Sequence, residues 1–147
     1  MATTQDMSLQ VVHHVRDTCF CLHAQRYARA VARRFDEAFR PLALTNGQYS
    51  LLMALHRPQP VPMTPVAELL GMDRTTLTAA LKPLAQRGWV RVLRDPDDGR
   101  SRLLQLTPDG RAVLKKAVPI WRRVQADVQA QLSMSPERFR KALRTLG

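Results

Sequence analysis

The chain has 147 residues, of which 45% are hydrophobic, and these values indicate one globular domain with a sizeable core rather than a disordered chain. Its 19 Arg and 4 Lys outnumber 12 acidic residues and give a formal net charge of +11. This excess favours a polyanionic partner, because basic residues that neutralise phosphates release condensed counterions. No apolar run is long enough to span a bilayer, and Met1–Gln10 lacks the apolar core of a signal peptide. We therefore expect a cytoplasmic protein that makes no contact with membranes.

The first part of the chain predicts two helices followed by a loop. Apolar residues recur at helical spacing over residues 12–40, which indicates one long helix that Pro41 ends. Thr45 is a suitable N-cap for a second helix, which runs through Leu55. A loop is expected next because three prolines interrupt the pattern, namely Pro58, Pro60 and Pro62.

Two further helices follow with a very short turn between them. Thr64-Pro65 is typical of a helix start, since proline is tolerated at the first helical position, and Gly71 ends this short helix. Asp73 then caps a second helix that runs to Gly88, so the turn has only about three residues, as a helix-turn-helix requires. Pro83 lies inside that helix and predicts a kink or an early end of its last turn.

A basic hairpin comes directly after the helix-turn-helix. Trp89–Leu93 and Leu103–Leu106 have the composition of strands, and Asp97-Asp98-Gly99 between them is typical of a turn. A helix with polar residues at its start, followed by a hairpin with a basic tip, is a winged helix-turn-helix. Such a unit places a helix in the major groove of DNA and an arginine at the minor groove.

The last part of the chain predicts two more helices. Thr107-Pro108 begins a long one whose apolar spacing continues to Leu132, and Pro119 within it predicts a bend. Ser135-Pro136-Glu137 begins a final helix that reaches Leu146. Residues 108–146 carry more apolar surface than a lone helical tail of this length could bury against itself, which favours an interface between subunits.

Several motifs occur in a fixed order along the chain: Leu42–Thr45, Ala67–Gly71, Asp73–Thr78, Leu84–Val90, Asp95–Arg102 and Leu106–Gly110. Each is weak alone, but together they resemble the MarR family of bacterial transcriptional regulators across nearly the whole chain. Two departures are mild, because Ala43 stands where the family usually has glycine and Pro83 interrupts the recognition helix.

The resemblance implies a mainly α fold with a small β-hairpin and a single domain over residues 1–147. A winged helix-turn-helix lobe would occupy residues 45–107, and the N- and C-terminal helices, about 10–42 and 108–146, would form a dimerisation lobe. It also implies a homodimer whose winged lobes meet successive major grooves of a palindromic operator, since half-sites on one face of DNA lie about 34 Å apart. Trp121, at helical spacing, is interpreted as part of the dimer core, with a place in a ligand site as the alternative.

The expected DNA contacts lie on the recognition helix and on the wing. Those on the helix are Arg74, Thr75, Thr76, Thr78 and Lys82, because arginine pairs with guanine edges and threonine with phosphates or thymine methyls. Helix capping and solvation is the alternative role for one or two of these residues, and Thr76 stands three residues after the cap.

On the wing, the resemblance gives Arg100 the minor-groove contact and Asp98 the role of steadying it, with Arg94 and Arg102 on either side. The alternative is a solvated salt bridge in a turn, which contributes little.

The resemblance also implies an effector cleft between the dimer helices and the DNA-binding lobe that takes aromatic or phenolic acids. Arg26 and Arg29, with Tyr27, are the candidate ligands of an effector carboxylate. A solvated basic face is the alternative interpretation of these residues. The expected function is that of a ligand-responsive repressor, in which DNA and effector binding are negatively linked.

Cys19 and Cys21 are candidate redox residues, because some relatives sense oxidants through cysteines near the N-terminus. Residues two apart on a helix point to nearly opposite sides, so the pair is not expected to bond to itself, and an intersubunit disulfide stays open. The alternative is that both are small core residues.

Two other classes of function fit the sequence less well than a regulator does. A winged-helix module that only contacts proteins fits poorly with the arginine-rich wing. An enzyme is not expected, because paired carboxylates, a nucleophile with its base and a phosphate-binding glycine loop are missing from the sequence. The Cys and His residues lack zinc-ligand spacing, so no metal or cofactor is expected.

Overall fold

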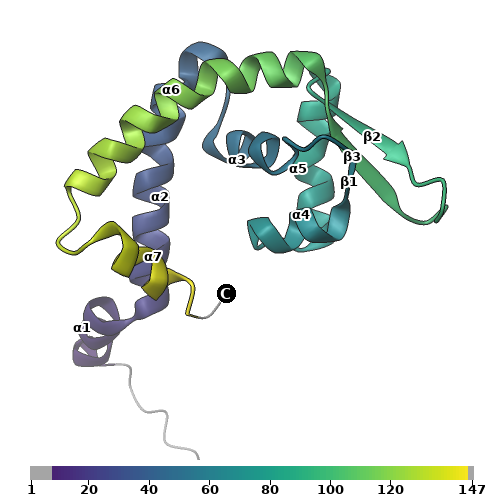
Figure 1. The fold of residues 1–147 in the computed structure, drawn as a ribbon. Helices are drawn as coiled ribbons and strands as arrows, with labels where there is room; N and C mark the ends of the chain where they lie inside the picture. The colour runs from purple at the N-terminus through teal and green to yellow at the C-terminus, as the bar shows by residue number, and fades with distance from the viewer. Residues whose placement is uncertain (1–7, 146–147) are drawn as a thin grey trace, which may run out of the picture.

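The computed structural model describes residues 8–145 and confirms a mainly helical fold with a small antiparallel sheet (Figure 1). Figure 1 shows the long helix α6 running from the sheet to α7, with α2 beside it, α3, α4 and α5 under the arch that they form, and α1 at the far end of α2. The elements, in chain order, are α1 (Leu9–Thr18), α2 (Phe20–Phe39), the 3-10 turn η1 (Arg40–Leu42), α3 (Asn46–Ala54), β1 (Val61–Pro62), α4 (Met63–Leu70), α5 (Arg74–Gln86), β2 (Val90–Arg94), β3 (Arg102–Leu106), α6 (Pro108–Ala130) and α7 (Pro136–Leu143).

The single first helix expected over residues 12–40 is wrong, because the chain breaks it at Cys19. This residue has φ −69° and ψ 108°, and its sulfur caps α2 by accepting a hydrogen bond from the Leu22 N–H at 3.4 Å. Just before the break, the Thr18 hydroxyl donates to the His14 carbonyl at 2.7 Å, a local bond that competes with regular helix. The apolar spacing runs through both helices without a change of phase, so it could not reveal the break.

The proline-rich segment predicted as a loop contains a short strand. Val61 and Pro62 pair antiparallel with Leu104 and Leu103, which makes β1 an edge strand in a sheet of order β1-β3-β2. An edge strand tolerates proline because one of its sides needs no N–H donor. Pro62 is then the N-cap of α4, so the helix begins at Met63, before the predicted start at Thr64.

Most of the predicted helix boundaries agree with the structure. Thr45 forms a capping box with Gln48, in which each side chain accepts a hydrogen bond from the other residue's N–H, at 3.2 and 3.1 Å. Pro83 does not end α5, which continues to Gln86. Figure 1 shows α6 bent along its length, as Pro119 predicted. The last helix ends at Leu143, and the predicted end at Leu146 lies outside the described residues.

One aromatic column joins α2 and α6 to the helices beneath them. The ring of Phe39 lies 6.0 Å from that of Phe35 and 4.9 Å from that of Tyr49, and Tyr49 stacks on Trp121 at 6.4 Å between centroids. Trp121, read from the sequence as dimer core, therefore packs within its own chain. Around this column lie the fully buried residues Leu51, Leu52, Leu55, Val66, Leu77, Leu84 and Leu104.

Ala43 has φ 49° and ψ 40°, the left-handed region that disfavours residues with a Cβ. We expect Ala43→Gly to raise the free energy of unfolding by about 0.5–1 kcal/mol, because relief of this strain exceeds the added flexibility of the unfolded chain. Urea unfolding measures the change. Ala112→Gly, an exposed position inside α6, is the control and should lose about 1 kcal/mol. An equal loss at position 43 would contradict the prediction.

Candidate nucleic-acid interface

The recognition helix α5 is fixed at its start by Asp73 and along one side by leucines. The Asp73 carboxylate accepts hydrogen bonds from the Thr76 N–H at 2.7 Å and from the Thr76 hydroxyl at 3.0 Å. Leu77, Leu81 and Leu84 are buried, so the helix cannot rotate without exposing them. The opposite, polar side of the helix is therefore held toward solvent.

A groove of about 370 Å³ lies between this polar side and the wing. Five of the residues predicted to contact DNA line it: Arg74, Thr78 and Lys82 from α5, and Arg100 and Arg102 from the hairpin. The Thr78 hydroxyl donates to the Arg74 carbonyl at 2.8 Å, so its hydrogen is engaged within the helix. The structure thus brings together cationic side chains that the sequence separates by up to 28 positions.

The other four predicted contacts do not line the groove. Thr76 is engaged in the cap through both its N–H and its hydroxyl, which confirms the alternative role considered for it. Asp98 accepts a hydrogen bond from the Arg100 N–H at 3.0 Å and so holds the turn backbone. The Arg94 guanidinium lies over Gly99, where an added Cβ would come 3.4 Å from Nη2. Thr75 is exposed in the first turn of α5.

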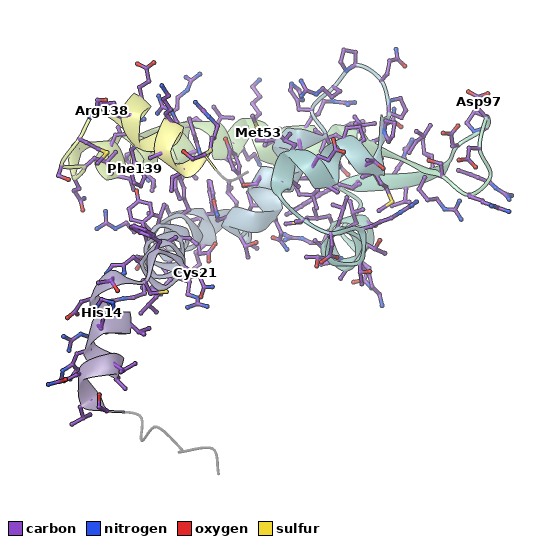
Figure 2. All side chains as sticks on the ribbon, turned by 90° about the horizontal axis from the view of Figure 1, so that it is seen from below. His14, Cys21, Met53, Asp97, Arg138 and Phe139 are labelled. Carbon is purple, nitrogen blue, oxygen red and sulfur yellow. The ribbon has the colours of Figure 1, made fainter. Side chains whose placement is uncertain are left out.

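The groove also has four apolar lining residues that were not predicted as DNA contacts, namely Met63, Leu81, Ala85 and Val92. Met63, at the start of α4, and Val92, on β2, both line it, and Val92 is 46% exposed. Val92 shares a strand face with the buried Val90, so alternation alone places it in the core. The hairpin extends beyond the core, however, and Figure 2 shows its tip at Asp97 projecting clear of the helices. Exposed apolar groups beside arginines suit thymine methyls.

The groove is strongly positive because its cations have no acidic partners. Among residues 8–145 the one ion pair joins Arg16 and Asp17, at the opposite end of the molecule. In the same part of the chain, the Arg100 guanidinium donates no hydrogen bond, whereas Arg102 donates to the carbonyls of Gly99 and Ser101. A short-turned helix pair, a basic wing and an unneutralised groove define the class of winged helix-turn-helix DNA-binding proteins.

The predicted effector residues do line one hollow, of about 470 Å³, on α2. Arg26, Tyr27 and Arg29 share it with His23 and Arg33. The Tyr27 ring packs edge-on against Phe139 of α7 at 5.1 Å, and Figure 2 shows Phe139 far from the tip of the wing. All the residues that line this hollow belong to α2, so it does not touch the DNA-binding lobe but lies on the long-helix side, which is formed by α2, α6 and α7.

A second cleft, of about 540 Å³, lies between the long helix and the DNA-binding lobe, where the resemblance placed the effector cleft, but none of its lining residues was predicted as an effector contact. Tyr49 and Met53 of α3, Leu69 of α4, and Trp121 and Arg122 of α6 line it. Burial raises the pKa of the Tyr49 phenol, although the positive charge of Arg122 opposes the shift, so the hydroxyl keeps its proton at neutral pH. In the sequence, the adjacent Trp121 and Arg122 were the signal that could have indicated a site for an aromatic anion.

Other site types find no support in the described part of the chain. Among residues 8–145, no group of three or more His, Cys, Asp or Glu side chains is placed to hold a metal ion. No helix there is both long and apolar enough to cross a membrane. Cys21 is exposed and Cys19 half-buried, so the reading of both as core residues is wrong for Cys21.

Comparison with known proteins agrees with the class. A model described as MarR family matches residues 44–101. The organic hydroperoxide resistance transcriptional regulator of Bacillus subtilis is 33% identical over 102 residues, which cover 69% of this chain and 68% of that protein. The M. tuberculosis transcriptional regulator MosR, solved in complex with DNA, has a TM-score of 0.79 and 39% identity, with 86% of this chain and 91% of that chain covered.

A further solved structure, the transcriptional repressor CouR bound to a 23-mer DNA duplex, has a TM-score of 0.70 and 29% identity over 88% of this chain and 89% of that chain. On these findings the chain belongs to the MarR family. Its relatives are transcriptional regulators and not enzymes.

The cap of the recognition helix makes a prediction about pH. Hydrogen bonds from Thr76, chiefly from its backbone N–H, lower the pKa of Asp73 below its usual value. A lowered folded-state pKa means that the stability gained from the charged cap is present above the unfolded-state pKa of about 3.9 and is lost as the pH falls through the folded-state value.

Asp73→Asn keeps a capping side chain but removes this titration. We expect the variant to be less stable than the wild type at pH 7, and the difference to shrink as the pH is lowered through 4 toward 3. Urea unfolding across this range measures it. Asp127→Asn, on the exposed side of α6, controls for loss of one negative charge. A stability difference that is constant with pH would refute this account of the cap.

Proposed function

We propose that the protein is a homodimeric repressor that binds a palindromic operator and leaves it when a small aromatic acid binds. The observation that carries the proposal is the groove in which unpaired cations of the recognition helix and the wing lie together. The DNA complexes of MosR and CouR support a DNA partner. In the proposed complex the start of α5 enters the major groove and Arg100 enters the adjacent minor groove.

The exposed apolar residues of the terminal helices support a dimer. No residue of α1 is buried, and a helix of 10 residues is marginal in water without packing. Figure 2 shows α1, around His14, projecting away from α7. The large hydrophobic residues that the N- and C-terminal segments leave exposed are Leu9, Val11, Val12, Val15, Phe20, Met134 and Leu143. A second copy of the chain would cover them, with dimer helices at about 10–42 and 108–146 and the winged lobe at 45–107.

Arg100→Ala tests the DNA-binding mode. We expect it to weaken binding to the cognate duplex by about 10- to 100-fold, because a minor-groove guanidinium contributes about 1–3 kcal/mol. Fluorescence anisotropy on a duplex selected from a random pool measures the affinity. Arg91→Ala is the matched control, since Arg91 is exposed on the same hairpin but does not line the groove. Equal losses in the two variants would argue for non-specific charge attraction instead.

The effector would act best from the cleft between α3, α4 and α6. A ligand shifts an equilibrium only by its differential affinity for the two states, so it must contact parts that move relative to each other. The cleft with Tyr49, Trp121 and Arg122 touches both the long helix and the DNA-binding lobe, and it offers aromatic faces beside a guanidinium. The hollow of Arg26, Tyr27 and Arg29 touches only the long-helix side within one chain.

Oxidation is a second candidate signal, favoured by the helix break at Cys19. The geometric objection to a Cys19–Cys21 disulfide assumed that both residues lie within one helix, whereas Cys19 is an extended cap. A hydroperoxide would oxidise the two thiols to a disulfide, releasing an alcohol and water. Cys21 is exposed and accepts a hydrogen bond from the Gln25 amide at 3.3 Å. The B. subtilis relative is named for organic hydroperoxide resistance.

One titration separates the two signals. The reduced protein, bound to its selected duplex, is treated either with benzoate and salicylate or with cumene hydroperoxide, and release is followed by anisotropy. If the effector proposal is right, the aromatic acids release the DNA, and Arg122→Ala raises the concentration needed by about tenfold or more. Cys19→Ser and Cys21→Ser should leave that response unchanged. Release by the hydroperoxide alone, abolished in either serine variant, would replace the effector with the redox signal.

A further inference from the structure

Arg87 lies where the recognition helix ends, and its guanidinium contacts both the turn at Ala43 and the ring of Trp89. It is the C-cap residue of α5. Its Nη1 donates a hydrogen bond of 2.5 Å to the carbonyl oxygen of Ala43, 44 residues earlier. Its Cζ lies 3.5 Å from the ring centroid of Trp89, the buried residue that precedes β2. One guanidinium therefore joins the end of the recognition helix, the base of the wing and the turn after α2.

The turn at Ala43 is one of the two covalent connections between the long helices and the DNA-binding lobe. Ala43 follows η1, which continues directly from α2, and its left-handed backbone turns the chain toward α3. The Arg87 hydrogen bond is made to the carbonyl of this strained residue. A rotation of α2 therefore moves the acceptor to which the end of the recognition helix is tied.

The second connection, at the start of α6, contacts the residues that directly follow Arg87, namely Gly88 and Trp89. The Thr107 hydroxyl donates to the Gly88 carbonyl at 2.7 Å, and the Thr107 N–H donates to the Trp89 carbonyl at 3.0 Å. Gly110 packs so closely that an added Cβ would lie 2.2 Å from the Trp89 carbonyl oxygen. Residues 87–89 are thus held by both connections, through side chain and backbone.

We propose that Arg87 is a positioning residue that sets the angle between the recognition helix and the two long helices. The role needs a planar group that can stack on Trp89 and donate in its own plane to Ala43 at the same time, and a guanidinium does both. A lysine ammonium is a point charge and cannot reproduce this arrangement. The inference rests on the dimer proposed above, because in a dimer this angle fixes the separation of the two recognition helices.

The consequence is a requirement for half-site spacing. Each inserted base pair moves one half-site along and around the duplex, so a dimer with fixed helices discriminates strongly between spacers. If Arg87 holds the angle, its loss broadens the range of spacers that the dimer accepts. A role in packing alone would lower stability without this effect, and a phosphate contact would lower affinity for every spacer equally.

The experiment compares affinity for the selected duplex with affinity for the same duplex carrying one extra central base pair. We expect Arg87→Gln and Arg87→Lys each to reduce the wild-type ratio of these affinities by fivefold or more, with lysine failing to rescue. Arg91→Gln, which removes the same charge from the hairpin, should keep the wild-type ratio. The slope of log affinity against log salt should stay unchanged in the Arg87 variants, since no phosphate contact is lost.

Trp89→Leu provides an independent variant, because it removes the stacking face but keeps a buried apolar side chain; it should lower the ratio in the same way. A wild-type ratio in all three variants, or full rescue by lysine, would overturn the role of Arg87. A salt slope reduced by about one would also overturn it and identify a phosphate contact. A wild-type protein that sediments as a monomer, or that ignores spacing, would instead remove the dimer and this inference with it.

Discussion

The aromatic column of Phe35, Phe39, Tyr49 and Trp121 is the packing on which the rest of the molecule depends. It ties the two long helices to α3, and the leucines of α5 pack into the same core. The long-helix side and the DNA-binding lobe therefore do not form separate cores joined by a linker. Because close-packed interiors transmit small displacements, a change at either side is felt at the other.

Local signals in the sequence predicted most of the fold. Thr45, Asp73 and Thr107 all cap helices as expected, because a cap depends only on residues three positions away. The strand at Val61 was missed because it exists only through its pairing with Leu104, a partner 43 positions later. The break at Cys19 was missed because the apolar spacing continues through it in the same phase, and no residue of α1 is buried that could have marked a separate helix.

The residues of the site were likewise predictable where local signals place them, and not where their position depends on the fold. Arg74 and Lys82 follow from helical spacing, and Arg100 follows from its place at the tip of the hairpin. The cationic residues of the groove could therefore be predicted from the sequence. Val92 could not, because its exposure depends on how far the hairpin projects beyond the core. Arg87 could not either, because its two partners are identified only once Ala43 and Trp89 are brought together by the fold.

The acidic residues near the DNA face hold backbone groups and do not pair with its arginines. Asp73, Asp95 and Asp98 lie among the arginines, yet each accepts a hydrogen bond from a backbone N–H of the turn or helix that it begins. These carboxylates satisfy backbone donors that would otherwise lack partners, and none of them forms an ion pair with an arginine among residues 8–145. The guanidinium groups of the groove are therefore not engaged in ion pairs with these carboxylates and can contact phosphates, whose neutralisation gives the favourable release of counterions. The carboxylates that cap the recognition helix and hold the turn of the wing therefore leave the cations of the groove without ion-pair partners among residues 8–145.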